Sequence, residues 1–389
     1  MPAPSRCPNP ACTNHHSPPR NWRRPYGSYP THAHGRVRRV RCRACGATAS
    51  WQTESLHYFA KRRLPLRAIW RSLLGGASLR EIADRYRLSP PAVQHAVQRL
   101  GRQAMAGQLC LLAELTPRER LVFDGLRSYL VSKDYPCDIT TVVEPEGETI
   151  LTMEHSIFTR GGTTTAAQGR RLAKRLQSWR PAAGTMSDDI SRVVSELWDY
   201  LRPSVLRPAL IDTDEHPLYR PAIRHSAPAR HFHPAGRLRH LRTPGSAPRT
   251  RENRLFAVNY ADRLLRHRLR EHTRGTIACG RHAVMQMHRA WIFAWDHNAR
   301  RPWRVKRPGM GVHAAQGAAA SEAVARLRRR FFTRRIIPTA AGLPESVRRA
   351  WLCELPTPPI RWRKGQKGTT VSCPAYARLQ LEAAVQQAA

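Results

Sequence analysis

The chain lacks a long apolar segment. No stretch approaches the ~18–20 apolar residues that a membrane-spanning helix needs, and the N-terminus carries no apolar signal segment. These absences predict a soluble, intracellular protein without a membrane partner. In that compartment the nine cysteines are expected to be metal ligands or buried thiols rather than a disulfide framework.

Acidic residues and lysines are also scarce. The 389 residues include only 27 Asp and Glu against 66 Lys and Arg, which gives a formal net charge of +39. An excess of this size predicts a polyanionic partner, because each neutralised phosphate releases counterions. Nearly all the basic residues are Arg, which suits bidentate phosphate contacts. A GC-rich genome would also favour Arg over Lys, but it would not explain the excess of positive charge.

The composition predicts an α+β chain with several domains. Four zones differ in their residues: a Cys- and His-rich zone, a zone of helical periodicity, a zone of alternating strand-like and helix-like segments, and a basic, Pro-rich region that is partly helical or disordered. These zones are 1–52, 55–107, 118–300 and 301–389. Pro117 and the stretches 234–251 and 301–308 are interpreted as linkers or loops.

Two pairs of cysteines predict a zinc ribbon in the first zone. Cys7 and Cys12 form a Cys-x4-Cys pair, and Cys42 and Cys45 form a Cys-x2-Cys pair. Four thiolates in two close pairs suit tetrahedral Zn²⁺, and Gly46 supplies the permissive backbone that a knuckle needs. A ribbon of this size buries little core, so the metal would supply much of its folding energy. Four histidines of the same zone could substitute for a ligand, but the four cysteines already complete the set: His15, His16, His32 and His34.

The segment 78–100, with the sequence SLREIADRYRLSPPAVQHAVQRL, predicts two short helices joined by a turn. Ser78 and Glu81 have the spacing of a capping box at the start of the first helix. Ser89 can cap the second helix, and Pro90 suits its first position.

A preceding helix at 64–74 would complete a small helix-turn-helix bundle. The second helix would then be the one that enters the major groove of DNA. The side chains that it would offer to the bases are Gln94, His95, Gln98 and Arg99. The alternative is an ordinary helical hairpin without DNA contacts.

From Leu121 the hydrophobic pattern becomes strand-like. Residues 168–179 and 188–201 are expected to be helical. The expected strands are 121–126, 138–143, 148–153 and 208–214. Three strands, then helices, then a fourth strand is the order of an RNase H-like sheet.

Two short motifs in this zone resemble those of insertion-sequence transposases with a DDE active site. The sequence TDEHPLY at 213–219 resembles their Thr-Asp-x-Trp/His-Pro-x-Tyr stretch. The sequence VNYAD at 258–262 is similar to the Asn-x-x-Glu of the helix that carries their third acid, and the basic run 264–276 continues the match. The order of ribbon, helix-turn-helix and first aspartate also fits, so the resemblance spans roughly residues 7–300.

Carried over position by position, the resemblance makes Asp124, Asp214 and Asp262 the catalytic acids. It implies that they bind Mg²⁺ or Mn²⁺ in a two-metal phosphodiester reaction. The third acid departs from the family, which usually has Glu there, and a shorter arm would bind one metal less well. Lower-ranked alternatives are Glu252 and Glu271 for the third acid and Asp212 for the second. The residues expected to contact DNA on the third-acid helix and after it are Asn259, Arg266 and Arg274.

The resemblance implies a transposase that binds the terminal repeats of its element through residues 1–107 and then cuts and rejoins double-stranded DNA. Action at two ends implies a homo-oligomer on DNA, in the cytoplasm of a bacterium and associated with the nucleoid. Two other functions remain open. One is a DNA-binding regulator or decayed transposase without catalysis, and the other is a ribosomal or RNA-associated basic protein.

Overall fold

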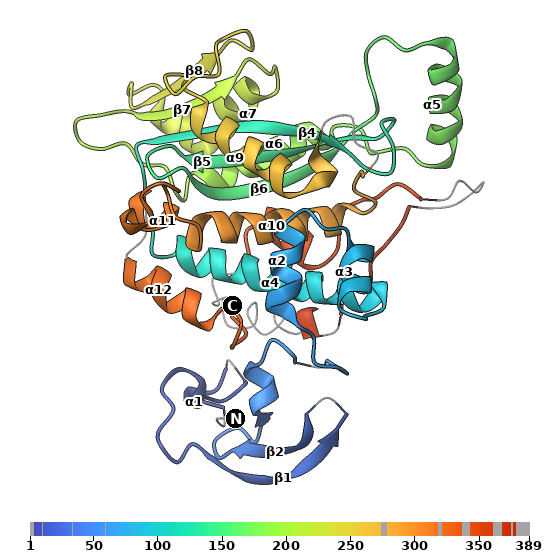
Figure 1. Cartoon of the computed structure of the whole chain (residues 1–389). Coiled ribbons are helices and arrows are strands. Elements are labelled where there is room, and N and C mark those ends of the chain that lie inside the picture. The colour runs from blue at the N-terminus through green and yellow to red at the C-terminus, as the bar shows by residue number, and fades with distance from the viewer. Residues whose placement is uncertain are drawn as a thin grey trace.

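The computed structural model of the chain has three parts: a small N-terminal sheet, a layer of helices and a five-stranded sheet (Figure 1). It describes residues 4–9, 11–32, 34–58, 60–273, 278–317, 321–336, 343–360, 368–374 and 376–378. Among these residues, no helix combines the length and the apolar character needed to cross a membrane.

The N-terminal part is an antiparallel sheet of order β1-β2-β3. Its elements are α1 (Thr13–His16), β1 (Arg23–Thr31), β2 (Gly35–Cys42), β3 (Thr48–Ser50) and η1 (Trp51–Glu54). Apart from three of the cysteines, its buried apolar residues are few: Trp22, Val37 and Ala49. So small a core makes this part dependent on the cysteine cluster for its stability.

The middle layer contains the three helices that the sequence predicts between residues 64 and 100. Its helices are α2 (Leu66–Leu74), α3 (Leu79–Arg85) and α4 (Pro90–Leu112). The predicted capping box is confirmed: Glu81 N donates to Ser78 Oγ at 3.2 Å, and Ser78 N donates to a Glu81 carboxylate oxygen at 2.6 Å. Ser89 Oγ accepts from Ala92 N at 3.4 Å at the start of α4. Unlike the short second helix that was expected, α4 runs for 23 residues.

The long extension of α4 packs on α10 (Ala283–Ala299), which lies between α4 and the large sheet (Figure 1). Two glycines allow this close approach. A Cβ at Gly101 would lie 2.6 Å from the Cβ of His288, and a Cβ at Gly107 would lie 3.1 Å from the ring of Trp295. The backbones of the two helices therefore come nearer to each other than larger residues would allow.

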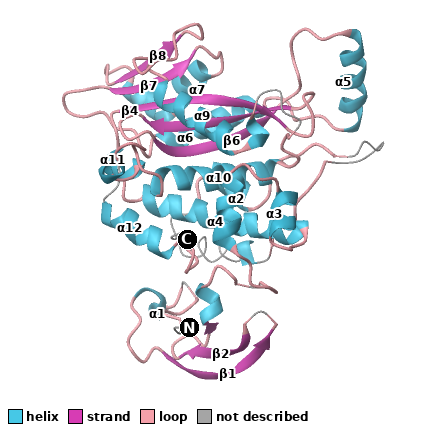
Figure 2. Cartoon of the chain, in the orientation of Figure 1, coloured by secondary structure: helices cyan, strands magenta, loops and turns pink. Residues whose placement is uncertain are grey.

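The large sheet has the strand order β6-β5-β4-β7-β8 (Figure 2). Its strands are β4 (Arg120–Tyr129), β5 (Pro136–Glu144), β6 (Thr149–Ile157), β7 (Ala209–Asp214) and β8 (Leu238–Thr243). The first three strands pair antiparallel, whereas β7 pairs parallel to β4, and β8 parallel to β7. The four predicted strands are confirmed.

The fifth strand corrects the prediction that 234–251 is a loop. In β8 only Leu238 and Thr243 are buried, and the residues between them are Arg, His, Leu and Arg. An edge strand with so few buried side chains has almost no hydrophobic alternation, so pairing with β7 determines its structure.

Helices cover both faces of the large sheet (Figure 2). On one face, Leu121 and Phe123 of β4 pack in a hydrophobic cluster with α6 and α7. On the other face, Val122 and Leu126 pack with α9 and α10. Asp124 shares the face of Val122 and Leu126 because side chains alternate along a strand. The helices not yet given bounds are α5 (Ala166–Ser178), α6 (Thr185–Leu197), α7 (Tyr219–His225), α8 (Ala227–Phe232), α9 (Phe256–Arg268) and η2 (Arg270–His272).

The described part of 301–389 is partly helical and contributes to the core. Its elements are η3 (Pro308–Met310), α11 (His313–Gly317), α12 (Ser321–Arg330) and α13 (Glu345–Trp351). Phe331 and Trp351 are fully buried in the same hydrophobic cluster as Ile69 of α2, Leu100 of α4 and Val122 of β4. One continuous core therefore joins residues from the zones 55–107, 118–300 and 301–389.

Candidate metal centre and acidic site

The four cysteines of the N-terminal part form one compact cluster. Cys7 Sγ lies 3.4 Å from Cys45 Sγ, Cys12 Sγ lies 3.8 Å from Cys42 Sγ, and all four sulfur atoms are within 4.8 Å of one another. Tetrahedral Zn–S bonds of about 2.3 Å place sulfur atoms roughly 3.8 Å apart. The cluster therefore has the ligand type and the spacing of a site that could hold a metal such as zinc.

Neighbouring groups hold the sulfur atoms in place. Asn14 Nδ2 donates to Cys42 Sγ and Asn9 N donates to Cys7 Sγ, both at 3.4 Å. Gly46, at φ +73°, turns the chain after the second pair. Hydrogen bonds of this kind orient thiolate ligands and stabilise their negative charge. His15 lies nearby, but its Nδ1 is hydrogen-bonded to the carbonyl oxygen of Cys7 at 2.7 Å, so the cluster is one of cysteines alone.

Three different elements position the predicted catalytic acids. Asp124 lies in β4, Asp214 is the last residue of the neighbouring β7, and Asp262 lies on α9, which packs over β4 and β5. Gly125 N donates to Asp124 Oδ1 at 2.7 Å, and His216 N donates to Asp214 Oδ1 at 2.8 Å. Asp262 is 6% exposed, and its Oδ1 has no hydrogen-bond partner in the described part of the chain.

The three carboxylates influence one another electrostatically. Burial and the negative charge of Asp214 raise the pKa of Asp124 to about 7. Burial and the charge of Asp124 raise the pKa of Asp262 well above its ordinary value, while Arg266 opposes the rise. The acids thus share one neighbourhood, although among the described residues only the cysteines form a group of three or more ligands within 4.8 Å.

A fourth acid, Asp138 of β5, was not singled out from the sequence as a site residue. Its carboxylate fills the space beside Gly125, where a Cβ would lie 2.2 Å from Asp138 Oδ2. By strand alternation it approaches from the sheet face opposite to Asp124. Burial raises the pKa of Asp138 to about 6, Arg127 opposes the rise, and the charge of Asp214 adds to it. Asp138 therefore adds negative charge beneath the three acids without joining them as a ligand.

Tyr219 packs beneath the same part of the sheet. Its ring lies edge-on to that of Phe123, with centroids 4.8 Å apart, and the side chain is 1% exposed. Burial and the charges of Asp124 and the neighbouring acids raise the pKa of its hydroxyl well above 10. The Tyr of the sequence TDEHPLY is thus a packing residue in the free protein.

The three alternative acids, Asp212, Glu252 and Glu271, lie in surroundings that differ from those of Asp124, Asp214 and Asp262. Asp212 is buried and pairs with Arg120 at 2.7 Å, and Glu271 is buried and pairs with Arg289. Glu252 is exposed in the turn before α9. Asp212 and Glu271 are each paired with an arginine, whereas Asp124 and Asp262 have no ion pair among the described residues.

The residues expected to contact DNA are divided between surface and interior. On α4, Gln94 is half-buried and His95 is exposed, but Gln98 is only 4% exposed. Arg99 donates to the carbonyl oxygen of Leu56 at 3.2 Å and lies over the ring of Tyr376. Gln98 and Arg99 are therefore engaged inside the protein.

The expected contacts around α9 lie close to the acids. Asn259 and Arg266 are half-buried, and the charge of Arg266 acts on Asp262 and Asp138. Arg274 lies outside the described residues. Arg266 is thus suitably placed to meet an anionic group that approaches the carboxylates.

The sequence matches no protein-family model and no curated protein.

Proposed function

We propose that the chain is a DNA transposase that cuts and rejoins DNA at Asp124, Asp214 and Asp262. The observation that carries this proposal is that these three acids, from β4, the end of β7 and α9, lie near one another: the charge of Asp214 acts on Asp124, and the charge of Asp124 acts on Asp262. The strand order β6-β5-β4-β7-β8, with its antiparallel and parallel halves, supports the RNase H-like sheet that the transposase resemblance implies.

The residues fit a divalent cation. Carboxylate oxygens are the hard ligands that Mg²⁺ and Mn²⁺ prefer. Asp262 Oδ1 is buried without a hydrogen-bond partner, a costly state for an isolated carboxylate that a cation would relieve. Asp124, Asp214 and Asp262 would hold the cation, and Asp138 would add to the negative field from the far face of the sheet. A bound divalent cation supplies Lewis-acid activation of a phosphodiester bond and stabilises the leaving oxygen.

The chain's own basic residues would position the DNA. Arg266 is placed to contact a phosphate that reaches the acids, and its charge opposes the rise in the pKa of Asp262. His95 and Gln94 on the accessible side of α4 are the candidates for base contacts. The net charge of +39 suits binding to the phosphate backbone over a wide surface. Zinc at the cysteine cluster would have a structural role, and cutting at two DNA ends implies a homo-oligomer.

A second candidate is a DNA-binding regulator without catalysis. It is favoured by one observation: the oxygens of the three acids do not come together within 4.8 Å as the cysteine sulfur atoms do. The short Asp262 side chain, in place of the Glu usual in the family, is consistent with such a loss.

A nicking assay separates these functions. Purified protein is incubated with supercoiled plasmid and with linear duplex, in Mg²⁺, Mn²⁺ or EDTA. We expect metal-dependent nicking that Asp214→Asn reduces to the level seen in EDTA, with duplex affinity retained. The control is Glu252→Gln, which removes an exposed carboxylate before α9, the helix that carries Asp262, and is expected to nick normally. Duplex binding without nicking in either metal would favour the regulator, and absence of duplex binding would exclude both functions.

A further inference from the structure

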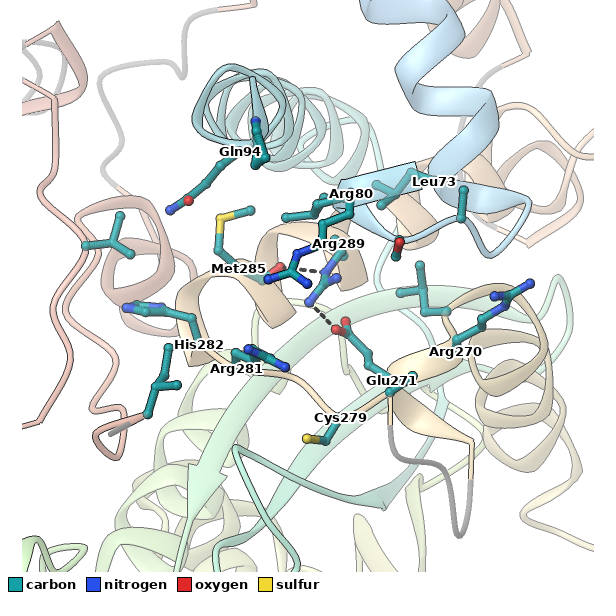
Figure 3. A pocket seen from close by; sticks show the side chains of 18 of the residues that line it. Leu73, Arg80, Gln94, Arg270, Glu271, Cys279, Arg281, His282, Met285 and Arg289 are labelled. Atoms are coloured by element: carbon teal, nitrogen blue, oxygen red, sulfur yellow. Dashed lines mark hydrogen bonds and ion pairs between the residues drawn. The ribbon is translucent and has the colours of Figure 1, made fainter. Parts of the chain in front are cut away.

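A cavity of about 650 Å³ lies between the start of α3 and α4 and residues 269–271 and 278–282 (Figure 3). This volume is in the range of small-molecule sites. Much of the lining is apolar, from Leu73, Leu79, Pro90, Leu269, Met285 and Val371. The cavity is distinct from both the cysteine cluster and the acids, and neither site accounts for its polar residues.

One buried polar residue in the lining makes no side-chain hydrogen bond within the described residues. His282 is 8% exposed, and neither of its ring nitrogens is hydrogen-bonded within the described residues; the Thr369 main chain approaches it without hydrogen-bond geometry. Burial lowers the pKa of His282 to about 4, so at neutral pH the ring offers one donor and one acceptor. Figure 3 shows Gln94, whose amide also carries a donor and an acceptor, on the other side of Met285.

The mouth of the cavity is positively charged. Arg289 pairs with Glu271, and Arg270 lies 3.8 Å from Glu81. Arg80 and Arg281 are exposed and have no ion pair in the part of the chain that the structure describes. Two uncompensated guanidinium groups beside an apolar cavity suit a ligand that joins an anionic group to a flat apolar body.

We propose that this cavity binds one nucleotide. The base would lie against Met285 and the apolar walls, with its hydrogen-bonding edge toward His282 and Gln94. The phosphate would contact Arg80 and Arg281. A nucleotide combines these features: a flat ring, an edge of adjacent donors and acceptors, and an anion.

The nucleotide has two possible sources, an unpaired nucleotide of bound DNA or a free mononucleotide. The position favours DNA, since the first turns of α3 and α4 form one wall. On the other side, His272 Nδ1 lies 3.3 Å from Ser128 Oγ of β4. Ser128 is four residues from Asp124, about 13 Å along an extended strand. The DNA source rests on the proposed function, whereas the free-nucleotide source does not.

The test compares three probes on the full-length protein with zinc present. The first is a fully paired duplex, the second is the same duplex with one unpaired central 2-aminopurine, and the third is a set of the four deoxynucleoside monophosphates. The variants are His282→Phe, which removes both ring nitrogens at similar volume, and Arg281→Ala, an exposed position that folding does not depend on. The matched control is Arg329→Ala, which removes the same charge from an exposed site on α12.

We expect the wild type to bind the duplex with the unpaired base at least about fivefold more tightly than the paired duplex. Both pocket variants should lose that preference, and Arg329→Ala should keep it. Binding of a monophosphate that both variants lose would support the proposal with a free nucleotide as source. Should His282→Phe fail to fold, Arg281→Ala decides. Equal affinity for the two duplexes, together with no monophosphate binding, would overturn the proposal. Binding of the paired duplex by the wild type tests the proposed function separately, because that binding does not require the cavity.

Discussion

At the scale of single residues, some buried acids form an ion pair with an arginine and others do not. Asp134, Asp212 and Glu271 are buried, and each has an arginine partner. Asp124 and Asp262 are also largely withdrawn from water, yet neither has an ion pair among the described residues. In a chain with 66 basic residues, partners for carboxylates are abundant. Asp138, Glu144 and Glu196 are likewise buried without an ion pair among the described residues. The arrangement is therefore shared by several acids, and it is the one that cation binding requires.

The raised pKa of Asp124 predicts a pH-dependent stability that a divalent cation reverses. The folded state holds this proton more tightly than the unfolded chain, so ionisation penalises folding. The contribution is most favourable below about pH 4 and is lost as the pH rises toward about 7. The difference corresponds to at most about 4 kcal/mol, because neighbouring carboxylates share it.

Urea denaturation of metal-free wild type and Asp124→Asn at pH 5 and pH 8 measures this effect. We expect the variant to gain stability relative to wild type at pH 8 and much less at pH 5. Added Mg²⁺ at pH 8 should stabilise the wild type and leave the variant unchanged. A wild-type-minus-variant difference that is the same at both pH values would show that the Asp124 carboxyl titrates normally.

At the scale of elements, the two sides of α4 differ in their exposure to solvent. His95 is exposed, whereas Gln98 is buried against the rest of the protein. We expect His95→Ala to weaken DNA binding while the free energy of unfolding stays within about 0.5 kcal/mol of wild type. Gln98→Ala should do the reverse, lowering stability with little change in affinity at temperatures where it is folded. Chemical denaturation and duplex titration on both variants test this, and loss of DNA contacts by Gln98→Ala alone would restore the sequence-based assignment.

The sequence correctly predicts those elements whose pattern is contained within one short segment of the chain. The cysteine spacing, the capping box at Ser78 and the apolar runs of the first four strands are local, and all appear in the structure. What the sequence misses depends on partners elsewhere in the chain. Gln98 is internal because of how α4 is packed, and β8 exists because β7 offers a free edge. Asp138 lies beside Gly125, on the face opposite to Asp124, because of the pairing register of β4 and β5.

At the scale of the whole molecule, the N-terminal part joins the rest through a short polar segment. Arg335 N donates to the carbonyl oxygen of Glu54 at 2.7 Å, and Leu56 enters the main hydrophobic cluster. Among the described residues, the hydrophobic cluster around the cysteines includes Trp22 and two half-buried residues, Val40 and Ala47. The fold of residues 4–50 and that of the main core therefore rest on different interactions.

Removal of zinc should consequently unfold the N-terminal part alone. We expect Cys42→Ser, or chelation of the wild type, to expose residues 4–50 to proteolysis and to release stoichiometric zinc. The main core should retain its cooperative unfolding transition. Limited proteolysis with mass spectrometry and a colorimetric zinc assay measure both effects. Cys110→Ser, at a half-buried cysteine outside the cluster, is the control, and a protease-resistant Cys42→Ser protein would argue against a structural metal.

The continuous core predicts that the C-terminal region is needed by the entire body of the protein. Trp351 is 1% exposed, its indole donates to the carbonyl oxygen of Ala377 at 3.0 Å, and its own carbonyl oxygen accepts two bonds from Arg102 of α4. Replacing it with Ala should cost about 3–5 kcal/mol and shift one cooperative transition of the main core. Leu206→Ala, at a 91% exposed site, should change stability by less than about 0.5 kcal/mol. Hydrogen exchange of β4 and α4 would report the effect, because both belong to the cluster that contains Trp351. Faster hydrogen exchange confined to residues 343–378, with β4 and α4 still protected, would show that the C-terminal region is a separate folding unit. That result would contradict a single continuous core.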